Sequence, residues 1–246
     1  MNFSLAEAAL AAVVAFAASI VGGLSGYGVG LVLPVVIAPI VGVTGVIPAM
    51  AIAMSLGNGS RVIAYWREID RRRAAQIIVT GLPLSFLGAW FYTLLPERAV
   101  ATLLGAFLIV IVPLRRWLEH KKYVLGTPGL MAVSSVHGLI SGAMSGAGLM
   151  IISALMAAGV TGGALIGTDA AAALLVNLVK IGMFGGAGLI DLNLLLFGLM
   201  MGLATFPGAF LARAILKRMP VKIHTAMMDA IVLFGGASFL WRAVRG

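Results

Sequence analysis

The chain has 246 residues, of which 61% are hydrophobic and only 10% are charged, and its mean hydropathy is +1.11. Water-soluble domains are about half apolar and about a quarter charged, so this composition excludes a soluble protein. The net charge of +9 would suit a nucleic-acid partner, but most basic residues gather in short loops between apolar segments, as the positive-inside bias predicts. Cysteine is absent, which excludes disulfides and thiolate chemistry. We therefore expect an integral membrane protein that binds no nucleic acid.

Ten apolar segments follow one another along the chain, and they predict an all-α, polytopic membrane protein. They cover residues 5–22, 28–41, 44–66, 74–95, 98–115, 127–145, 147–159, 162–184, 192–212 and 222–241. The second and seventh are shorter than the ~20 residues that cross ~30 Å of hydrocarbon. They are either tilted or partly buried helices, or the returning arms of two helical hairpins that meet inside the membrane.

Each short segment follows a stretch rich in glycine and serine, at residues 22–30 and 141–148. A glycine in a helix costs about 1 kcal/mol relative to alanine, so both stretches favour a broken helix. In hydrocarbon, a broken helix is tolerated only where protein or a wet cavity satisfies its freed N–H and C=O groups. The breaks therefore predict a binding site.

The two halves of the chain share motifs in the same order, about 120 residues apart, which indicates a duplication. We expect a first repeat at residues 1–122 and a second at residues 123–246, within a single membrane domain. The matched motifs are Ser25-Gly26 with Ser145-Gly146, and Asn58 and Arg61 with Asn177 and Lys180.

Basic loops predict the orientation of these repeats. The loops within 61–73, 115–122 and 213–222 should be cytoplasmic. Five segments in each repeat is an odd number, so the second repeat is inverted relative to the first. Inverted repeats are typical of transporters that work by alternating access, with the substrate site near the midplane.

Amide and cationic side chains three residues apart lie on one helix face in each half, and they are our candidate anion ligands: Asn58, Arg61, Asn177 and Lys180. A charge in the bilayer costs roughly 2.5–3.5 kcal/mol and is normally functional. Arg61 could instead open the basic loop and extend to the interface.

The breaks add further candidate substrate-binding positions: Ser25, Gly26, Ser145 and Gly146. The serines could donate hydroxyl groups, or they could be small residues that let helices approach. Three ionisable groups at membrane depth are candidates for proton coupling: His137, Asp169 and Asp229. Each could equally be a satisfied interior polar group, and Asp169 could pair with Lys180.

Enzyme motifs are absent. The sequence has no Walker loop, no His-Glu-x-x-His and no cluster of metal ligands, so we expect no enzyme, cofactor or metal site. An intramembrane serine hydrolase would need a base beside Ser25 or Ser145, and the sequence pairs neither with His137.

The first break reads Val21-Gly22-Gly23-Leu24-Ser25-Gly26-Tyr27-Gly28-Val29-Gly30-Leu31-Val32-Leu33-Pro34, and a degenerate Ser-Gly-Ala-Met-Ser-Gly-Ala-Gly copy lies in the second half. With its length, segment number and duplication, the chain resembles the sulfite exporter TauE/SafE family, also called toluene-sulfonate uptake permeases. The second copy departs from the pattern, with Ile151-Ile152 where the proline would fall.

This resemblance implies a carrier of sulfite, sulfoacetate or sulfonates in a prokaryotic cytoplasmic (inner) membrane. A small-anion channel and a non-transporting membrane scaffold stay open as alternatives. The expected partners are a small anion and the lipid bilayer. The sequence leaves the exact substrate, direction, coupling ion and oligomeric state open, a homo-oligomer included.

Overall fold

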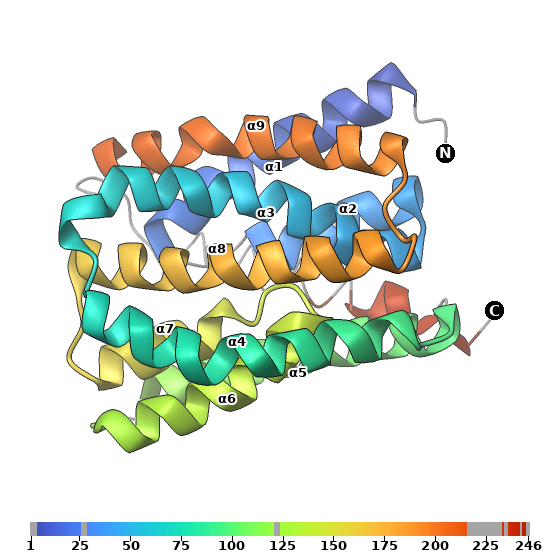
Figure 1. Cartoon of the computed structure of the whole chain (residues 1–246). Helices are drawn as coiled ribbons and strands as arrows, with labels where there is room; N and C mark the ends of the chain where they lie inside the picture. The colour runs from blue at the N-terminus through green and yellow to red at the C-terminus, as the bar shows by residue number, and fades with distance from the viewer. Residues whose placement is uncertain are drawn as a thin grey trace.

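The computed structural model describes residues 4–25, 29–120, 124–215, 233, 236–241, 243 and 244, and every element in these ranges is helical. The helices (Figure 1) are α1 Leu5–Ser25, α2 Val29–Val41, α3 Val43–Tyr65, η1 Trp66–Glu68, α4 Arg71–Thr93, α5 Glu97–His120, α6 Thr127–Ala143, α7 Gly148–Ala157, α8 Gly162–Gly186 and α9 Leu192–Ile215. Each of the first nine predicted segments coincides with one of the α-helices. Most of the tenth, 222–241, lies outside the described residues.

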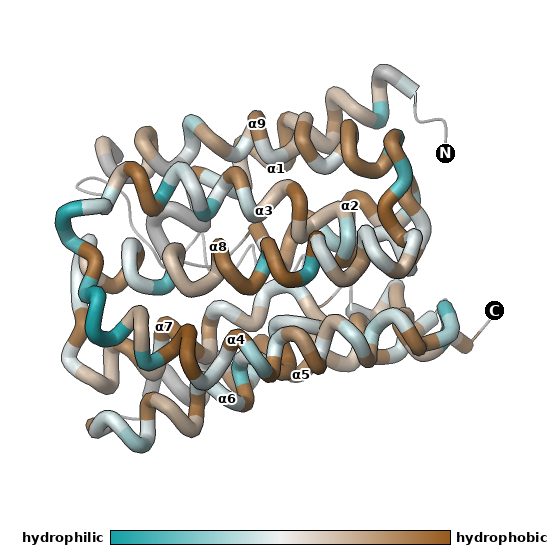
Figure 2. The backbone as a smooth tube through the Cα atoms, in the orientation of Figure 1, coloured by the Kyte–Doolittle hydropathy of each residue, from teal (hydrophilic) through white to brown (hydrophobic). Residues whose placement is uncertain are grey.

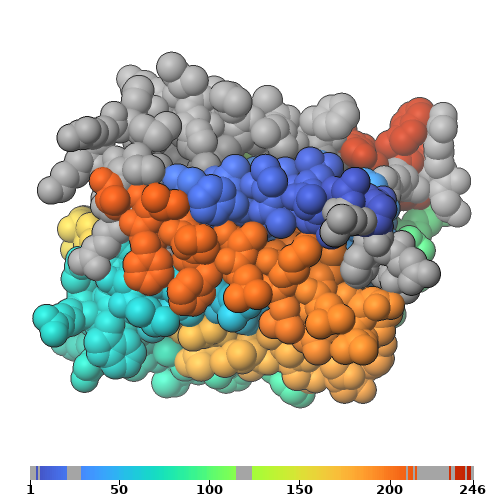
Figure 3. Space-filling model, turned by 90° about the horizontal axis from the view of Figure 1, so that it is seen from above, coloured from blue at the N-terminus to red at the C-terminus, as the bar shows by residue number. Residues whose placement is uncertain are grey.

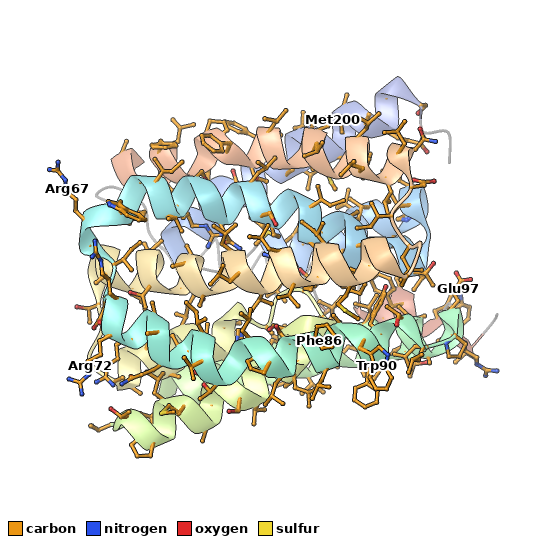
Figure 4. All side chains as sticks on the ribbon, in the orientation of Figure 1. Arg67, Arg72, Phe86, Trp90, Glu97 and Met200 are labelled. Atoms are coloured by element: carbon orange, nitrogen blue, oxygen red, sulfur yellow. The ribbon has the colours of Figure 1, made fainter. Side chains whose placement is uncertain are left out.

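The helices have the length and apolar surface of a membrane bundle. Within the described residues, α4, α8, α3 together with η1, and the larger parts of α5 and α9 are long and apolar enough to span a bilayer. Large apolar side chains face outward, among them Phe86 and Trp90 of α4, which point away from the bundle in Figure 4. Hydrophobic residues run along the helices, while hydrophilic ones gather at the turns between them (Figure 2). Such a surface suits contact with lipid tails.

The first break differs in detail from the prediction. Helix α1 continues to Ser25, so Gly22 and Gly23 lie inside a helix and do not interrupt it. Leu5 to Ser25 is a long apolar stretch, and in hydrocarbon the hydrogen bonds of a helix outweigh the low propensity of two glycines. The residues between Ser25 and Val29 lie outside the described ranges.

The long helices run side by side along the length of the bundle. Helix α3 packs between α8 and α9, α4 packs against α6 and α8, and α1 lies along α9. The last pair is visible in Figure 3, where α1 is blue and α9 is orange.

Arg67 and Arg72 lie at one end of the molecule and Glu97 at the other (Figure 4). The bundle therefore has a strongly basic end.

That basic end is also where α8 begins. The Asp70 side chain caps α4 by accepting a hydrogen bond from the Arg73 backbone N–H at 3.0 Å. The Asp70 backbone N–H donates to Thr168 Oγ1 of α8 at 2.9 Å, and the Glu68 carboxylate lies against Gly163. The connection between α3 and α4 thus packs on the first turns of α8.

The α6–α7 pair enters and leaves the bundle at this same end. The Leu125 backbone N–H, just before α6, donates to the Ala157 carbonyl at the end of α7 at 2.8 Å. Helix α7 has 10 residues, about 15 Å of helix, so it covers about half of the hydrocarbon thickness. The hairpin interpretation of this segment is therefore the one that fits the structure.

A row of small residues brings α4 and α6 into backbone contact. A side chain at Gly138 would lie 2.7 Å from Gly81 Cα, and one at Gly142 would lie 2.9 Å from Ala89 N. Ser85 and Ser134 continue the two rows at a spacing of four residues, and both are fully buried. Such small residues at every fourth position let membrane helices approach closely.

Candidate functional site

A polar cavity, lined largely by buried residues, lies where α2, α3, α6, α8 and the α6–α7 break meet. Its volume is about 70 Å³, which is room for roughly five water-sized groups. Its walls are partly apolar, with Val29, Met54 and Val176 among them. The polar residues that line it are Asn58, Arg61, His137, Ser141, Ser145, Asp169, Asn177 and Lys180.

Helix α3 contributes an amide and a cation from one face. Asn58 is 1% exposed and Arg61 is 5% exposed, and both line the cavity. The alternative in which Arg61 extends to the interface is therefore wrong. Gly57, which directly precedes Asn58, lies against α9, where a Cβ on it would be 3.0 Å from Thr205 Oγ1. This close packing holds the polar stripe of α3 toward the interior.

Helix α8 contributes a second stripe, on which residues 169, 173, 177 and 180 follow one another at helical spacing. Asp169 is 3% exposed, and its charge interacts with that of Arg61, which lines the same cavity. The expected alternative partner, Lys180, lies about 16 Å further along the same helix axis. Asp169 thus faces the cation of the other half of the chain.

Lys180 binds the end of α6. Its Nζ donates to the Ser141 carbonyl at 3.0 Å and to the Met144 carbonyl at 2.9 Å. Carbonyl groups in the last turn of a helix have no partner in the helix, and they carry its negative dipole end. An ammonium group has three N–H donors, so two hold the break in place and one is left for the cavity.

The second break crosses the start of α2. Gly146 has φ +89, a conformation that favours glycine, and a Cβ on Gly30 would lie 2.7 Å from Gly146 N and 2.9 Å from Gly146 Cα. The two backbones touch with no room for a methyl group between them. Ser145 is buried beside this contact and lines the cavity.

Two buried polar atoms on the cavity wall have no hydrogen-bond partner among the described residues. They are Asn58 Nδ2, a donor, and Asp169 Oδ1, an acceptor. More than nine in ten buried polar groups are hydrogen-bonded in folded proteins, so such atoms on a cavity wall point to a polar ligand.

Most of the predicted site residues meet in this cavity. They are Asn58, Arg61, His137, Ser145, Gly146, Asp169, Asn177 and Lys180. Gly26, Asp229 and the side chain of Ser25 lie outside the described residues. Gly30, Ser141 and Met144 also line the cavity; they lie within the two predicted breaks but were not among the individual candidate residues. Ser141 stands four residues before Ser145, a spacing that places both on one face of a continued helix and could have identified it.

Cationic and amide donors gather on the cavity wall. Among the described residues no three His, Asp or Glu side chains cluster closely enough to hold a metal ion. Arg61, Lys180 and Asn58 are donors, and buried donors with positive charge are what an oxyanion requires.

A lipid-facing helical bundle around a buried, charged cavity is the arrangement of a membrane transporter. The sequence matches the family Sulfite exporter TauE/SafE over residues 11–239, a range that includes every residue of the cavity. The protein belongs to this family, whose members are membrane exporters of sulfite and related anions and not enzymes. No curated protein and no solved structure matches the chain.

Proposed function

We propose that this protein carries a small sulfur-containing or organic anion, of the sulfite, sulfoacetate or sulfonate class, across a prokaryotic cytoplasmic membrane by alternating access. The observation that carries the proposal is the cavity itself. Two cations, Arg61 and Lys180, are buried in it at 5% and 2% exposure, together with two amides. Each charge in the membrane costs roughly 2.5–3.5 kcal/mol, and Asp169 supplies only one negative charge beside these two cations, so a bound anion would balance the remaining positive charge.

The two moving parts in this proposal are inverted repeats, residues 1–122 and 123–246. The helices of each repeat pack on corresponding helices of the other repeat, which supports the duplication. Helix α4 of the first repeat packs on α6 and α8 of the second, and α9 of the second packs on α1 and α3 of the first. The α6–α7 pair opens at the basic end, whereas the junction of α2 and α3 lies at the far end of α3 (Figure 1). Inverted repeats would place their two hairpins with the open ends at opposite ends of the bundle.

The basic end, with Arg67 and Arg72, is the cytoplasmic face in this account, because loops rich in arginine remain in the cytoplasm. The cavity lies between the two ends, at the contact of α3 with α8. Rocking one repeat against the other would expose it to each side in turn. Asp169 and His137 line the cavity and are the candidate proton carriers.

A thermal-shift screen of the purified protein with sulfite, thiosulfate, sulfoacetate and carboxylates tests the anion site. A true ligand at 100 times its Kd adds about 2.7 kcal/mol to the free energy of unfolding. Uptake into proteoliposomes then separates the alternatives. A carrier saturates with substrate concentration, a small-anion channel does not saturate in the same range, and a scaffold gives no flux.

Replacing Asn58 with alanine is expected to weaken sulfite binding about tenfold or more, because a hydrogen bond to a charged group contributes roughly 1.5–3 kcal/mol. Asn58 Nδ2 has no partner among the described residues, so its loss leaves no protein acceptor unbonded. Isothermal titration calorimetry measures the effect. The matched control is Asn193→Ala, on an exposed position of α9. Equal sulfite affinity in both variants would contradict the assigned role of Asn58.

A further inference from the structure

The unpaired atoms of the cavity differ in kind, and that difference restricts the ligand. Asn58 Nδ2 can only donate, and Asp169 Oδ1, in an ionised carboxylate, can only accept. Both line the same cavity of about 70 Å³. A ligand that satisfies both must present an acceptor to Asn58 and a hydrogen to Asp169.

The charged side chains on the cavity wall restrict the ligand further. Arg61 from α3 and Lys180 from α8 are the cations on the cavity wall, and Asp169 is the acidic residue there among those described. His137 from α6 is the remaining titratable side chain on the wall. With His137 neutral, the ionised groups sum to one positive charge. A single negative charge on the ligand balances them.

We propose that the preferred substrate is a singly charged oxyanion that keeps an acidic hydrogen. This deepens the proposed function and rests on it. The O–H group of the anion donates to Asp169 Oδ1, and its other oxygens accept from Asn58 Nδ2 and the two cations. Hydrogensulfite and hydrogenphosphonates belong to this class, whereas sulfonates, which have no such hydrogen, do not.

The same geometry couples the anion to a proton. The hydrogen lies between an oxygen of the ligand and Asp169 Oδ1, so a doubly charged anion binds only if Asp169 brings the hydrogen. In either case the loaded cavity holds one proton with each anion. A singly charged oxyanion without a hydrogen would either place a negative oxygen against the ionised Asp169, where like charges repel, or bind with Asp169 protonated and leave one positive charge of the cavity unbalanced.

Two nearly isosteric anions test the inference on the wild-type protein. Methylphosphonate, at a mildly acidic pH where it is mostly singly charged, has the O–H group. Methanesulfonate has the same shape and charge without it. We expect methylphosphonate to bind at least tenfold more tightly in isothermal titration, since a buried acceptor left unbonded costs at least that factor. Equal affinities would overturn this inference and leave the anion site standing. Binding of neither anion would overturn the proposed function as well.

The Asp169→Asn variant gives a second arm. Its amide can donate to the ligand, and it removes the negative charge from the cavity. Methanesulfonate should then bind at least as tightly as methylphosphonate, so the preference disappears or reverses. The control is Asp191→Asn, at the start of α9, where the carboxylate accepts from the Leu194 backbone N–H at 2.7 Å. A preference for methylphosphonate that survives in Asp169→Asn would overturn the proposal.

Discussion

Replacing Gly30 with alanine is expected to lower anion transport at least tenfold and to destabilise the protein by about 1–3 kcal/mol. The added methyl group would lie 2.7 Å from Gly146 N and 2.9 Å from Gly146 Cα, and both are backbone atoms that cannot rotate away. The start of α2 and the second break must then separate. Because Ser145 and Gly146 line the cavity, that separation changes the shape of the anion site. Uptake into proteoliposomes and thermal unfolding in detergent measure the two effects.

Gly182→Ala is the matched control for this experiment. Gly182 lies in α8, and a Cβ there meets nothing within 4 Å. Alanine has the higher helix propensity by about 1 kcal/mol, so this variant should be as stable as the wild type or more stable, with unchanged transport. Wild-type transport by Gly30→Ala would mean that the contact of the two segments does not shape the site.

The Lys180→Met variant should lose anion binding at least tenfold and should also loosen the α6–α7 break. Methionine keeps most of the length of the side chain but removes the charge and both hydrogen bonds. The carbonyls of Ser141 and Met144 then lose the donor that binds them at 3.0 and 2.9 Å. Each buried carbonyl without a partner costs about 1–3 kcal/mol, partly offset because the cation is no longer desolvated. Calorimetry with sulfite and hydrogen exchange over residues 141–148 measure these changes.

Lys180→Arg separates the charge from the particular geometry of lysine. It keeps a cation that can bond to the same carbonyls, so it should retain more sulfite binding and more protection of the break than Lys180→Met. If Lys180→Met bound sulfite as the wild type does, Lys180 would be only a structural link between α8 and α6.

The polar stripes of the site were predictable because they are local. Asn58 with Arg61, and Asp169 with Asn177 and Lys180, are polar residues in apolar surroundings at helical spacing, so the sequence alone indicates a common face. Their burial also follows from the cost of charge in hydrocarbon. The structure brings both stripes to one cavity.

The partners of these side chains were not predictable, because they come from distant parts of the chain. The sequence allowed Asp169 to pair with Lys180, yet Asp169 interacts with Arg61 and Lys180 binds carbonyls of α6. Every residue has a backbone carbonyl, so the sequence does not show which carbonyls a lysine binds. Nothing in it indicated that Lys180 holds the α6–α7 break. The contact of Gly30 with Gly146 is of the same kind, since both stretches contain several equivalent glycines.

Helix boundaries followed the apolar pattern, but the packing between helices did not. The rows of small residues on α4 and α6 resemble many others in a chain with 32 glycines. Only the paired positions, such as Gly81 beside Gly138, distinguish the rows that touch from those that face lipid. Gly182 is an example of the second kind, because open space surrounds it.

Anomalous diffraction from crystals soaked in selenite tests the central claim most directly, since selenite has the shape and charge of sulfite and its selenium can be located without bias. We predict one selenium site inside the cavity, with selenite oxygens within hydrogen-bond distance of Asn58, Arg61 and Lys180. Selenium bound elsewhere on the protein, with the cavity free of it at a concentration that saturates transport, would contradict the claim that this cavity is the anion site.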